Sequence, residues 1–377
     1  MKIGKIFGIE ITVSLSWLFV FALVAWSIAS DFGPLRGIAL APGQRVLLGA
    51  IASLLFFASV LLHELAHSLL ARKRGVPVRG ITLFIFGGVS TFEGEPRSAP
   101  TEAWISAVGP LASLVLGLGF WGLALALGPS SAIGLVISYL AFANIVLAIF
   151  NILPAFPLDG GRVLHALVWR ATGDRLRATR IAANIGAVLA GGLIVYGIGV
   201  TLLTGFGGGL WTTFIGWFLL QAGNAERRQS ELQGALVGHV ASELTAPTTP
   251  RVPADATVER AFATMRETQT RVLPVYLGER FIGFVAIDDL AKLPPDQFPA
   301  TYVTAIMTRL EATPTLAAGD DAREALAQMS RDGSQALAVV DAAGDLVGLI
   351  TRESVLHWLS TRLSGATSKA VQPADAA

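Results

Sequence analysis

The sequence predicts a multi-span α-helical membrane protein, with about six transmembrane helices and a membrane-dipping β segment, followed by a soluble α/β pair of repeats. Three observations predict this fold class. Residues 1–223 are mostly long apolar runs, residues 224–377 hold most of the acidic residues, and the second part contains an internal repeat. Charged residues make up only 15% of the chain, whereas an ordinary soluble domain has about 25%.

Six apolar runs approach the roughly 20 residues that a helix needs to cross the hydrocarbon layer. They cover residues 11–29, 46–71, 103–127, 132–153, 181–203 and 209–223. Lys2 and Lys5 precede the first run, but no small-residue cleavage site follows it. We therefore expect the first span to be retained rather than removed as a signal peptide.

Lysine and arginine are distributed unequally between the ends of these runs. One side receives most of them, including the cluster at 72–74, whereas the other side receives only Arg36 and Arg45. Basic loops stay in the cytoplasm. This predicts a multi-pass protein of the cell membrane, embedded in the lipid bilayer, with both termini and the soluble repeats in the cytoplasm. No basic face suggests nucleic acid as a partner, and the absence of cysteine excludes disulfides and thiolate metal ligands.

The second apolar run contains a His-Glu-x-x-His motif, formed by His63, Glu64 and His67. Residues four apart share one face of a helix, so both imidazoles can face one metal ion, with Glu64 placed to activate water as a base. The alternative is two buried histidines and a paired glutamate without a metal. Each charged group at the centre of a bilayer costs about 2.5–3.5 kcal/mol, which disfavours that alternative.

The position of the motif within its span gives its depth. Arg72 marks the basic boundary, five residues after His67 and nine after His63. At 1.5 Å per residue, the two histidines lie roughly 7–14 Å below this boundary. The predicted metal site is therefore inside the membrane but closer to the cytoplasmic face.

Residues 80–92 are rich in β-branched and aromatic side chains and are too short to cross as a helix. We interpret them as an extended segment at the membrane edge, turned by Gly87 and Gly88. Backbone of this kind is tolerated at depth only where protein or a wet cavity surrounds it. The alternative is an apolar connector between two helices.

A second polar segment follows the fourth run. Pro154, Pro157, Gly160 and Gly161 prevent a continuous helix there. The unwound segment carries Asp159, whose carboxylate can serve as the third ligand that the two histidines lack. Taken alone, this segment also reads as an ordinary cytoplasmic loop.

The soluble part repeats at a spacing of about 64 residues, with Met265 and Gly283 recurring as Met329 and Gly348. Each copy reads helix, apolar strand, turn, apolar strand, helix, which predicts a pseudo-symmetric α/β pair. The expected domains are the membrane domain at 1–223, a linker at 224–239, repeats at 240–295 and 302–362, and a disordered tail at 363–377.

Together these motifs resemble the site-2 protease family of intramembrane zinc metalloproteases, in the subgroup with a C-terminal pair of CBS domains. The matching motifs are His63-Glu64-Leu65-Ala66-His67, Asn151…Pro154…Pro157-Leu158-Asp159-Gly160-Gly161, and the weaker Gly87-Gly88 and Gly109-Pro110-Leu111-Ala112. The resemblance implies a zinc-dependent intramembrane endopeptidase. One Zn²⁺ would be held by His63, His67 and Asp159, Glu64 would be the catalytic base, and Asn151 and the strand with Gly87 and Gly88 would hold an extended substrate.

The family also implies partners and regulation. Its substrates are single-span membrane proteins, such as anti-sigma-like regulators or remnant signal peptides, cleaved in regulated intramembrane proteolysis. The cytoplasmic CBS pair would regulate the enzyme or join two copies as a homodimer.

The chain departs from the family patterns in several places. Ser113 stands where many relatives have Asn, which we expect to affect helix packing only. Each CBS nucleotide site keeps half of its pattern. The first has Asp289 but Ala286 in place of Thr, and the second has Thr351 but Ser354 in place of Asp. We therefore expect weak binding of adenine nucleotides.

Two other classes compete with this interpretation. A transporter or channel with a CBS tail would show an inverted repeat and polar residues along a path, and neither is evident. A catalytically inactive adaptor would not need Glu64. Among the remaining histidines, His165 is expected near the membrane boundary, although six residues after Asp159 it could also contact the surroundings of the metal ligands. His239 and His357 are expected at the surface of the soluble part.

Overall fold

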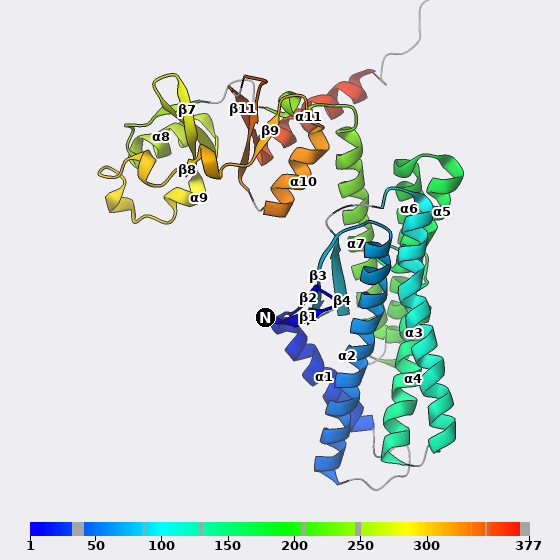
Figure 1. The fold of residues 1–377 in the computed structure, drawn as a ribbon. Helices are drawn as coiled ribbons and strands as arrows, with labels where there is room; N and C mark the ends of the chain where they lie inside the picture. Colours follow the sequence, from blue (N-terminus) through cyan, green and yellow to red (C-terminus); the bar gives the residue numbers. More distant parts are fainter. Residues whose placement is uncertain are drawn as a thin grey trace, which may run out of the picture. The chain divides into compact units, whose positions relative to one another are not determined.

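The computed structural model describes residues 1–31, 41–85, 87–92, 94, 96–128, 131–205, 209–245, 250–332, 334–343 and 345–369. Arg36 and the last eight residues of the predicted tail lie outside this part of the chain. The chain divides into two compact units, Met1–Ser230 and Glu231–Ala377, which are described separately (Figure 1).

Seven helices make up most of the first unit. They are α1 (Leu15–Asp31), α2 (Pro42–Lys73), α3 (Ala99–Leu127), α4 (Ala132–Asn151), α5 (Asp159–Thr172), α6 (Arg175–Thr204) and α7 (Gly209–Ala235). Helices α2, α3, α4 and α6 are long and apolar enough to cross a membrane, and α1 is a shorter apolar helix. The run at 209–223 forms the first part of α7. The multi-span helical architecture is confirmed, and the count of six spans stays a prediction.

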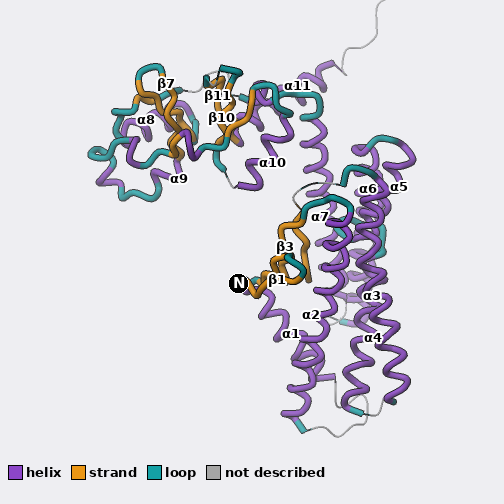
Figure 2. The backbone as a smooth tube through the Cα atoms, viewed as in Figure 1, coloured by secondary structure: helices purple, strands orange, loops and turns teal. Residues whose placement is uncertain are grey.

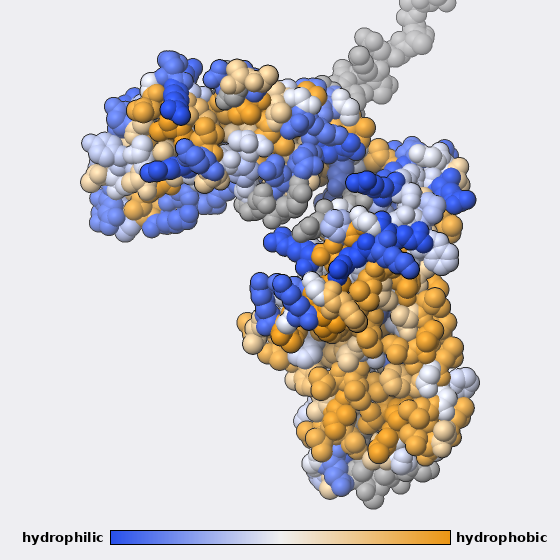
Figure 3. Space-filling view, in the orientation of Figure 1, coloured by the Kyte–Doolittle hydropathy of each residue, from blue (hydrophilic) through white to orange (hydrophobic). Residues whose placement is uncertain are grey.

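Small residues set the close contacts between these helices. Gly117 of α3 faces Ile145 of α4, and Gly49 of α2 faces the backbone of Ala25 in α1, where an added methyl group would meet its neighbours at about 3 Å or less. Lipid provides no hydrophobic drive for helices to associate, so close backbone approach stabilises the bundle instead. The outer surface of the helices is strongly hydrophobic (Figure 3), as a lipid-facing surface must be.

A four-stranded sheet lies against α2, with the order β1 (Lys2–Ile6), β2 (Ile9–Val13), β3 (Val78–Phe84), β4 (Gly87–Phe92). Strands β2 and β3 are parallel, whereas β1–β2 and β3–β4 are antiparallel hairpins. The strands of this sheet are orange in Figure 2, beside the purple α2. The predicted extended segment at 80–92 is thus a real hairpin. Gly87 and Gly88, which were predicted to turn the segment, are the first residues of β4, and Gly87 pairs with Phe84 at the end of β3.

The sequence prediction of a first span at 11–29 is wrong at its start. Residues up to Val13 belong to β2, where Ile9, Ile11 and Val13 are buried in alternation, and the helix begins only at Leu15. Ile9, Ile11 and Ile81 pack against Leu65 of α2. The sheet therefore lies directly beside the turn of α2 that carries the His-Glu-x-x-His motif.

The chain between α4 and α5 folds back without a regular helix and contains a cis peptide bond at Phe156–Pro157. Gly160 and Gly161 allow α5 to press against this segment, because a methyl group at position 161 would lie only 2.5 Å from the carbonyl carbon of Ala155. Helix α5 starts at Asp159, so Asp159, Gly160 and Gly161 form its first turn, whereas the sequence prediction placed them in the unwound segment.

The second unit contains the predicted pair of α/β repeats. Helix η1 (Ala241–Leu244) precedes both repeats in the chain and packs in the core of the second. The first repeat comprises β5 (Val252–Pro253), α8 (Val258–Thr268), β6 (Val272–Leu277), β7 (Arg280–Ala286), α9 (Ile287–Leu290), η2 (Pro295–Gln297), η3 (Val303–Ala305) and β8 (Thr308–Arg309). The second comprises η4 (Leu310–Ala312), β9 (Thr315–Ala317), α10 (Ala322–Asp332), β10 (Ala336–Val340), β11 (Leu346–Thr351) and α11 (Arg352–Lys369). Their sheets have the orders β5-β6-β7-β8 and β11-β10-β9.

The predicted order of helix, strand, strand and helix is present in both repeats. Apolar residues of the two sheets, among them Phe284 and Leu349, form one core between the repeats. Two predicted boundaries differ from the structure. Helix α7 continues to Ala235 through most of the expected linker at 224–239, and α11 extends to Lys369, beyond the expected end of the repeat at 362.

Candidate metal centre

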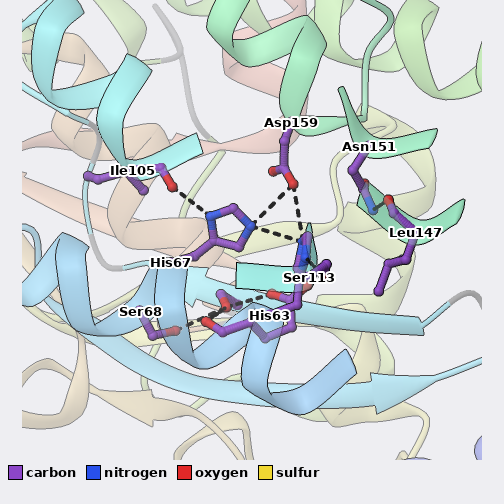
Figure 4. Close-up of polar contacts among 10 residues, drawn as sticks. His63, His67, Ser68, Ile105, Ser113, Leu147, Asn151 and Asp159 are labelled. Atoms are coloured by element: carbon purple, nitrogen blue, oxygen red, sulfur yellow. Dashed lines mark hydrogen bonds and ion pairs between the residues drawn. The ribbon is translucent and has the colours of Figure 1, made fainter. Parts of the chain in front are cut away.

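Three side chains from two helices converge on one point in the first unit (Figure 4). His63 and His67 lie one turn apart on α2, and Asp159 is the first residue of α5. The two Nε2 atoms are 3.2 Å apart, and each is 3.2 Å from Oδ2 of Asp159. Both histidines are buried, with 4% and 6% of their surface exposed. The structure therefore brings together the three ligands that the sequence predicted.

This triangle of donor atoms fits a tetrahedral metal ion. With metal–ligand distances of about 2.0–2.1 Å, neighbouring ligand atoms of a tetrahedral zinc site are about 3.3–3.4 Å apart. The three separations of 3.2 Å match that spacing within the tolerance of about 0.2 Å for such sites. Two imidazoles and one carboxylate form a donor set suited to Zn²⁺ that leaves a fourth position open.

Helix α3 orients both imidazoles. Nδ1 of His67 donates to the backbone carbonyl oxygen of Ile105 at 2.6 Å, and Nδ1 of His63 lies 2.9 Å from Oγ of Ser113. A carbonyl oxygen can only accept, so the proton of neutral His67 is on Nδ1 and the lone pair of Nε2 faces the centre. Hydrogen bonds of this kind fix the orientation of metal-binding histidines. Ser113 therefore contacts a predicted ligand, beyond the helix-packing role expected from the sequence.

Gly109 of α3 provides the space in which the imidazoles meet. A methyl group there would overlap Nε2 of His67 and would lie 2.8 Å from Nε2 of His63. Pro110 follows within the same helix. The Gly-Pro motif thus lies directly behind the predicted metal ligands.

Glu64 lies on the side of α2 that faces β4. Its Oε2 accepts a hydrogen bond of 2.7 Å from Oγ of Ser90, which in turn accepts one of 3.0 Å from Ser68. Gly88 packs against the same side chain, since a methyl group there would lie 2.5 Å from Cγ of Glu64. Strand β4 therefore holds the predicted base through residues on both sides of Val89.

The predicted substrate-binding residues Gly87 and Asn151 lie in different elements of the structure. Gly87 has a φ of +121°, which favours glycine, and it begins β4. Asn151 is half-buried at the end of α4, and its Nδ2 donates to the carbonyl oxygen of Leu147 at 3.0 Å. Within the described residues, no hydrogen bond joins Asn151 to His63, His67 or Asp159.

His165, which was predicted to lie near the membrane boundary, is buried within the protein, with 3% of its surface exposed. Its Nδ1 lies 3.0 Å from both carboxylate oxygens of Glu102. In the second unit, His239 pairs with Glu243 at 2.9 Å, and His357 is exposed as expected.

The two predicted nucleotide-binding residues are used in helix capping. Oδ2 of Asp289 accepts from the backbone nitrogen of Ala286 at 3.2 Å, and its Oδ1 pairs with Lys292 at 2.8 Å. Thr351 and Ser354 exchange hydrogen bonds between side chain and backbone at the start of α11, at 2.9 and 3.1 Å.

The fold and the metal centre define a class, that of membrane-embedded metallopeptidases with a tandem CBS module. Comparison with protein families agrees with this class. The model of peptidase family M50 matches residues 51–133 and 125–193, and that of the CBS domain matches residues 241–296 and 303–361. The chain belongs to peptidase family M50, which decides against the transporter alternative.

Similar proteins extend over nearly the whole chain. The putative zinc metalloprotease sll0528 of Synechocystis sp. is 33% identical over 370 residues, covering 96% of each chain. The putative zinc metalloprotease Rip3 of Mycobacterium tuberculosis is 34% identical and covers 95% of this chain and 92% of its own. The solved site-2 protease from Methanocaldococcus jannaschii is 28% identical, with a TM-score of 0.43, over 60% of this chain and 95% of that one.

Proposed function

We propose that this protein is a zinc-dependent intramembrane endopeptidase that cleaves single-span membrane proteins within or near their transmembrane segments. The observation that carries the proposal is the triangle of His63, His67 and Asp159, with Glu64 on the helical turn between the two histidines. Helix α2, which bears the motif, is long and apolar enough to cross the membrane.

The chemistry follows from the donor set. His63, His67 and Asp159 would hold Zn²⁺, which when bound supplies a Lewis acid that polarises the scissile carbonyl group. Glu64 accepts a proton from the attacking water and later passes it to the leaving amine. Ser90 orients the Glu64 carboxylate by donating to Oε2, so the other oxygen stays available for proton transfer. Ile105 and Ser113 hold the two imidazoles in place.

Strand β4 supports a role in binding an extended substrate. It lies at the edge of its sheet within the described residues, and it is in contact with Glu64 through Gly88 and Ser90. A transmembrane substrate must unwind before its peptide bond can react, and pairing with an edge strand replaces the lost backbone hydrogen bonds. Asn151 directly precedes the segment 152–158 that leads to Asp159. Its side-chain amide is able to donate to and accept from a peptide group.

The substrate class and the regulation are part of the same proposal. Anti-sigma-like regulators and remnant signal peptides are single-span chains of the required kind. The distribution of basic residues favours a cytoplasmic location for the termini and the CBS pair. There the CBS pair would regulate proteolysis, through dimerisation or substrate gating in preference to tight binding of adenine nucleotide.

The test uses the purified full-length protein in detergent. Zinc is quantified by mass spectrometry, and a panel of single-span substrates is incubated with the wild type and with His67→Ala. We expect one zinc per chain, cleavage within or near the spans, loss of activity on chelation and recovery on adding zinc. Undiminished cleavage by the chelated protein or by His67→Ala would refute the proposal.

A further inference from the structure

Glu102 and His165 form a buried pair that the proposed chemistry does not use. Nδ1 of His165 lies 3.0 Å from both Oε atoms of Glu102, and the two side chains are only 4% and 7% exposed. Glu102 lies in the first turn of α3, and His165 lies in the middle of α5. Burying two ionisable groups is costly even when they are paired, so such a pair in a membrane domain suggests a function.

The pair belongs to a stripe along one face of α3, formed by Glu102, Ile105, Gly109 and Ser113. Their spacings of three, four and four residues place them on the same side of the helix. Ile105 and Ser113 hold the two imidazoles, and Gly109 makes room for them. Glu102 extends the same face toward α5. One helix face therefore contacts both histidines and also the helix that carries the carboxylate.

The position of Asp159 depends on how α5 is docked. Asp159 is the first residue of this short helix, and the preceding segment at 152–158 has no regular helix. His165 lies six residues further along, about 9 Å along the helix axis. A shift or rotation of α5 at His165 is therefore transmitted directly to the Asp159 carboxylate.

We propose that the Glu102–His165 pair is a positioning device for the metal centre. It fixes α5 against α3 so that Asp159 stays at coordinating distance from His63 and His67. The proposal rests on the proposed function, since it requires these three side chains to hold the metal. Because the imidazole N–H lies between the two carboxylate oxygens in a buried site, the contact fixes the separation of α5 and α3 at this point. Apolar packing alone would not give that precision.

The test measures metal affinity in the full-length protein in detergent. Glu102→Gln keeps the shape of the side chain but removes its charge, and His165→Leu removes the imidazole. The double variant Glu102→His/His165→Glu restores the pair in reverse. The matched control is Ser53→Ala, which removes a fully buried hydroxyl bonded to the backbone of Phe21, away from α3 and α5. Zinc affinity is measured by competition with a chelator, geometry by the absorption of bound Co²⁺, and stability by melting of the metal-free protein.

We expect each single variant to lower zinc affinity by about 10- to 100-fold and to change the Co²⁺ spectrum, as loss of contacts around metal ligands does. The reversed pair should recover much of the loss, and Ser53→Ala should bind zinc as the wild type does. Wild-type affinity and an unchanged Co²⁺ spectrum in Glu102→Gln would overturn this inference and leave the proposed function intact. If Ser53→Ala lost as much zinc affinity as the pair variants, and affinity fell in parallel with the melting temperature, the cause would be a general loss of stability. That result would also overturn the inference. A wild-type protein that binds no zinc would overturn both this inference and the proposed function.

Discussion

Replacing Gly109 by alanine should strongly weaken metal binding without removing any ligand. The added methyl group would overlap Nε2 of His67 and would lie 2.8 Å from Nε2 of His63. Ordinary contact needs about 3.5 Å, so His63 alone must move by about 0.7 Å and His67 by more. Zinc sites tolerate displacements of only about 0.2 Å. We therefore expect zinc affinity to fall by more than about 100-fold, beyond the effect of losing a supporting contact.

Gly119→Ala on the same helix is the matched control, because an added methyl group at that position meets nothing within 4 Å. Alanine is favoured over glycine in a helix interior by about 0.5–1 kcal/mol, so this variant should fold at least as well as the wild type. Both variants are compared by zinc stoichiometry and by competition with a chelator. Full stoichiometry with wild-type affinity in Gly109→Ala would refute the close approach of α3 to the imidazoles.

Four further predictions follow from the same geometry. Glu64→Gln should abolish cleavage while zinc stays bound, because only the proton acceptor is lost; turnover within about tenfold of the wild type would exclude Glu64 as the base. Asp159→Ala should lower zinc occupancy measured by mass spectrometry, and undiminished stoichiometry would mean that the third ligand lies elsewhere. Ser90→Ala should leave zinc binding unchanged but reduce kcat by about tenfold or more, since Glu64 loses its orienting hydrogen bond; an unchanged kcat would contradict that role. Titration of the full-length protein with ATP, ADP and AMP should give weak binding at best, because Ala286 and Ser354 each replace one polar anchor of the family's nucleotide pattern; micromolar affinity by calorimetry would contradict this.

The predicted metal ligands could be identified from the sequence, because helical periodicity determines which side chains share one face of a helix. His63 and His67 share a face at a spacing of four, and Asp159 follows a segment in which Pro154 and Pro157 interrupt the helix. The structure brings these three together as predicted. The division into a helical membrane unit and an α/β pair follows in the same way from composition and from the repeat.

The supporting contacts could not be predicted, because they join elements far apart in the chain through common residue types. Ile105 contributes only its backbone carbonyl oxygen, which any residue would supply. Ser90 and Ser113 are ordinary serines whose partners lie 26 and 50 residues away. Strand β2 was missed because its buried Ile and Val residues merge with the apolar run of α1.

The stripe on α3 links the metal centre to a helix that is long enough to cross the membrane. From Glu102 to Ser113 the stripe extends about 16 Å along this helix. A displacement of α3 by one residue would rotate its face by about 100° and advance it by about 1.5 Å, which would disengage all four positions together. The geometry of the ligands therefore depends on the register of a helix that provides none of them.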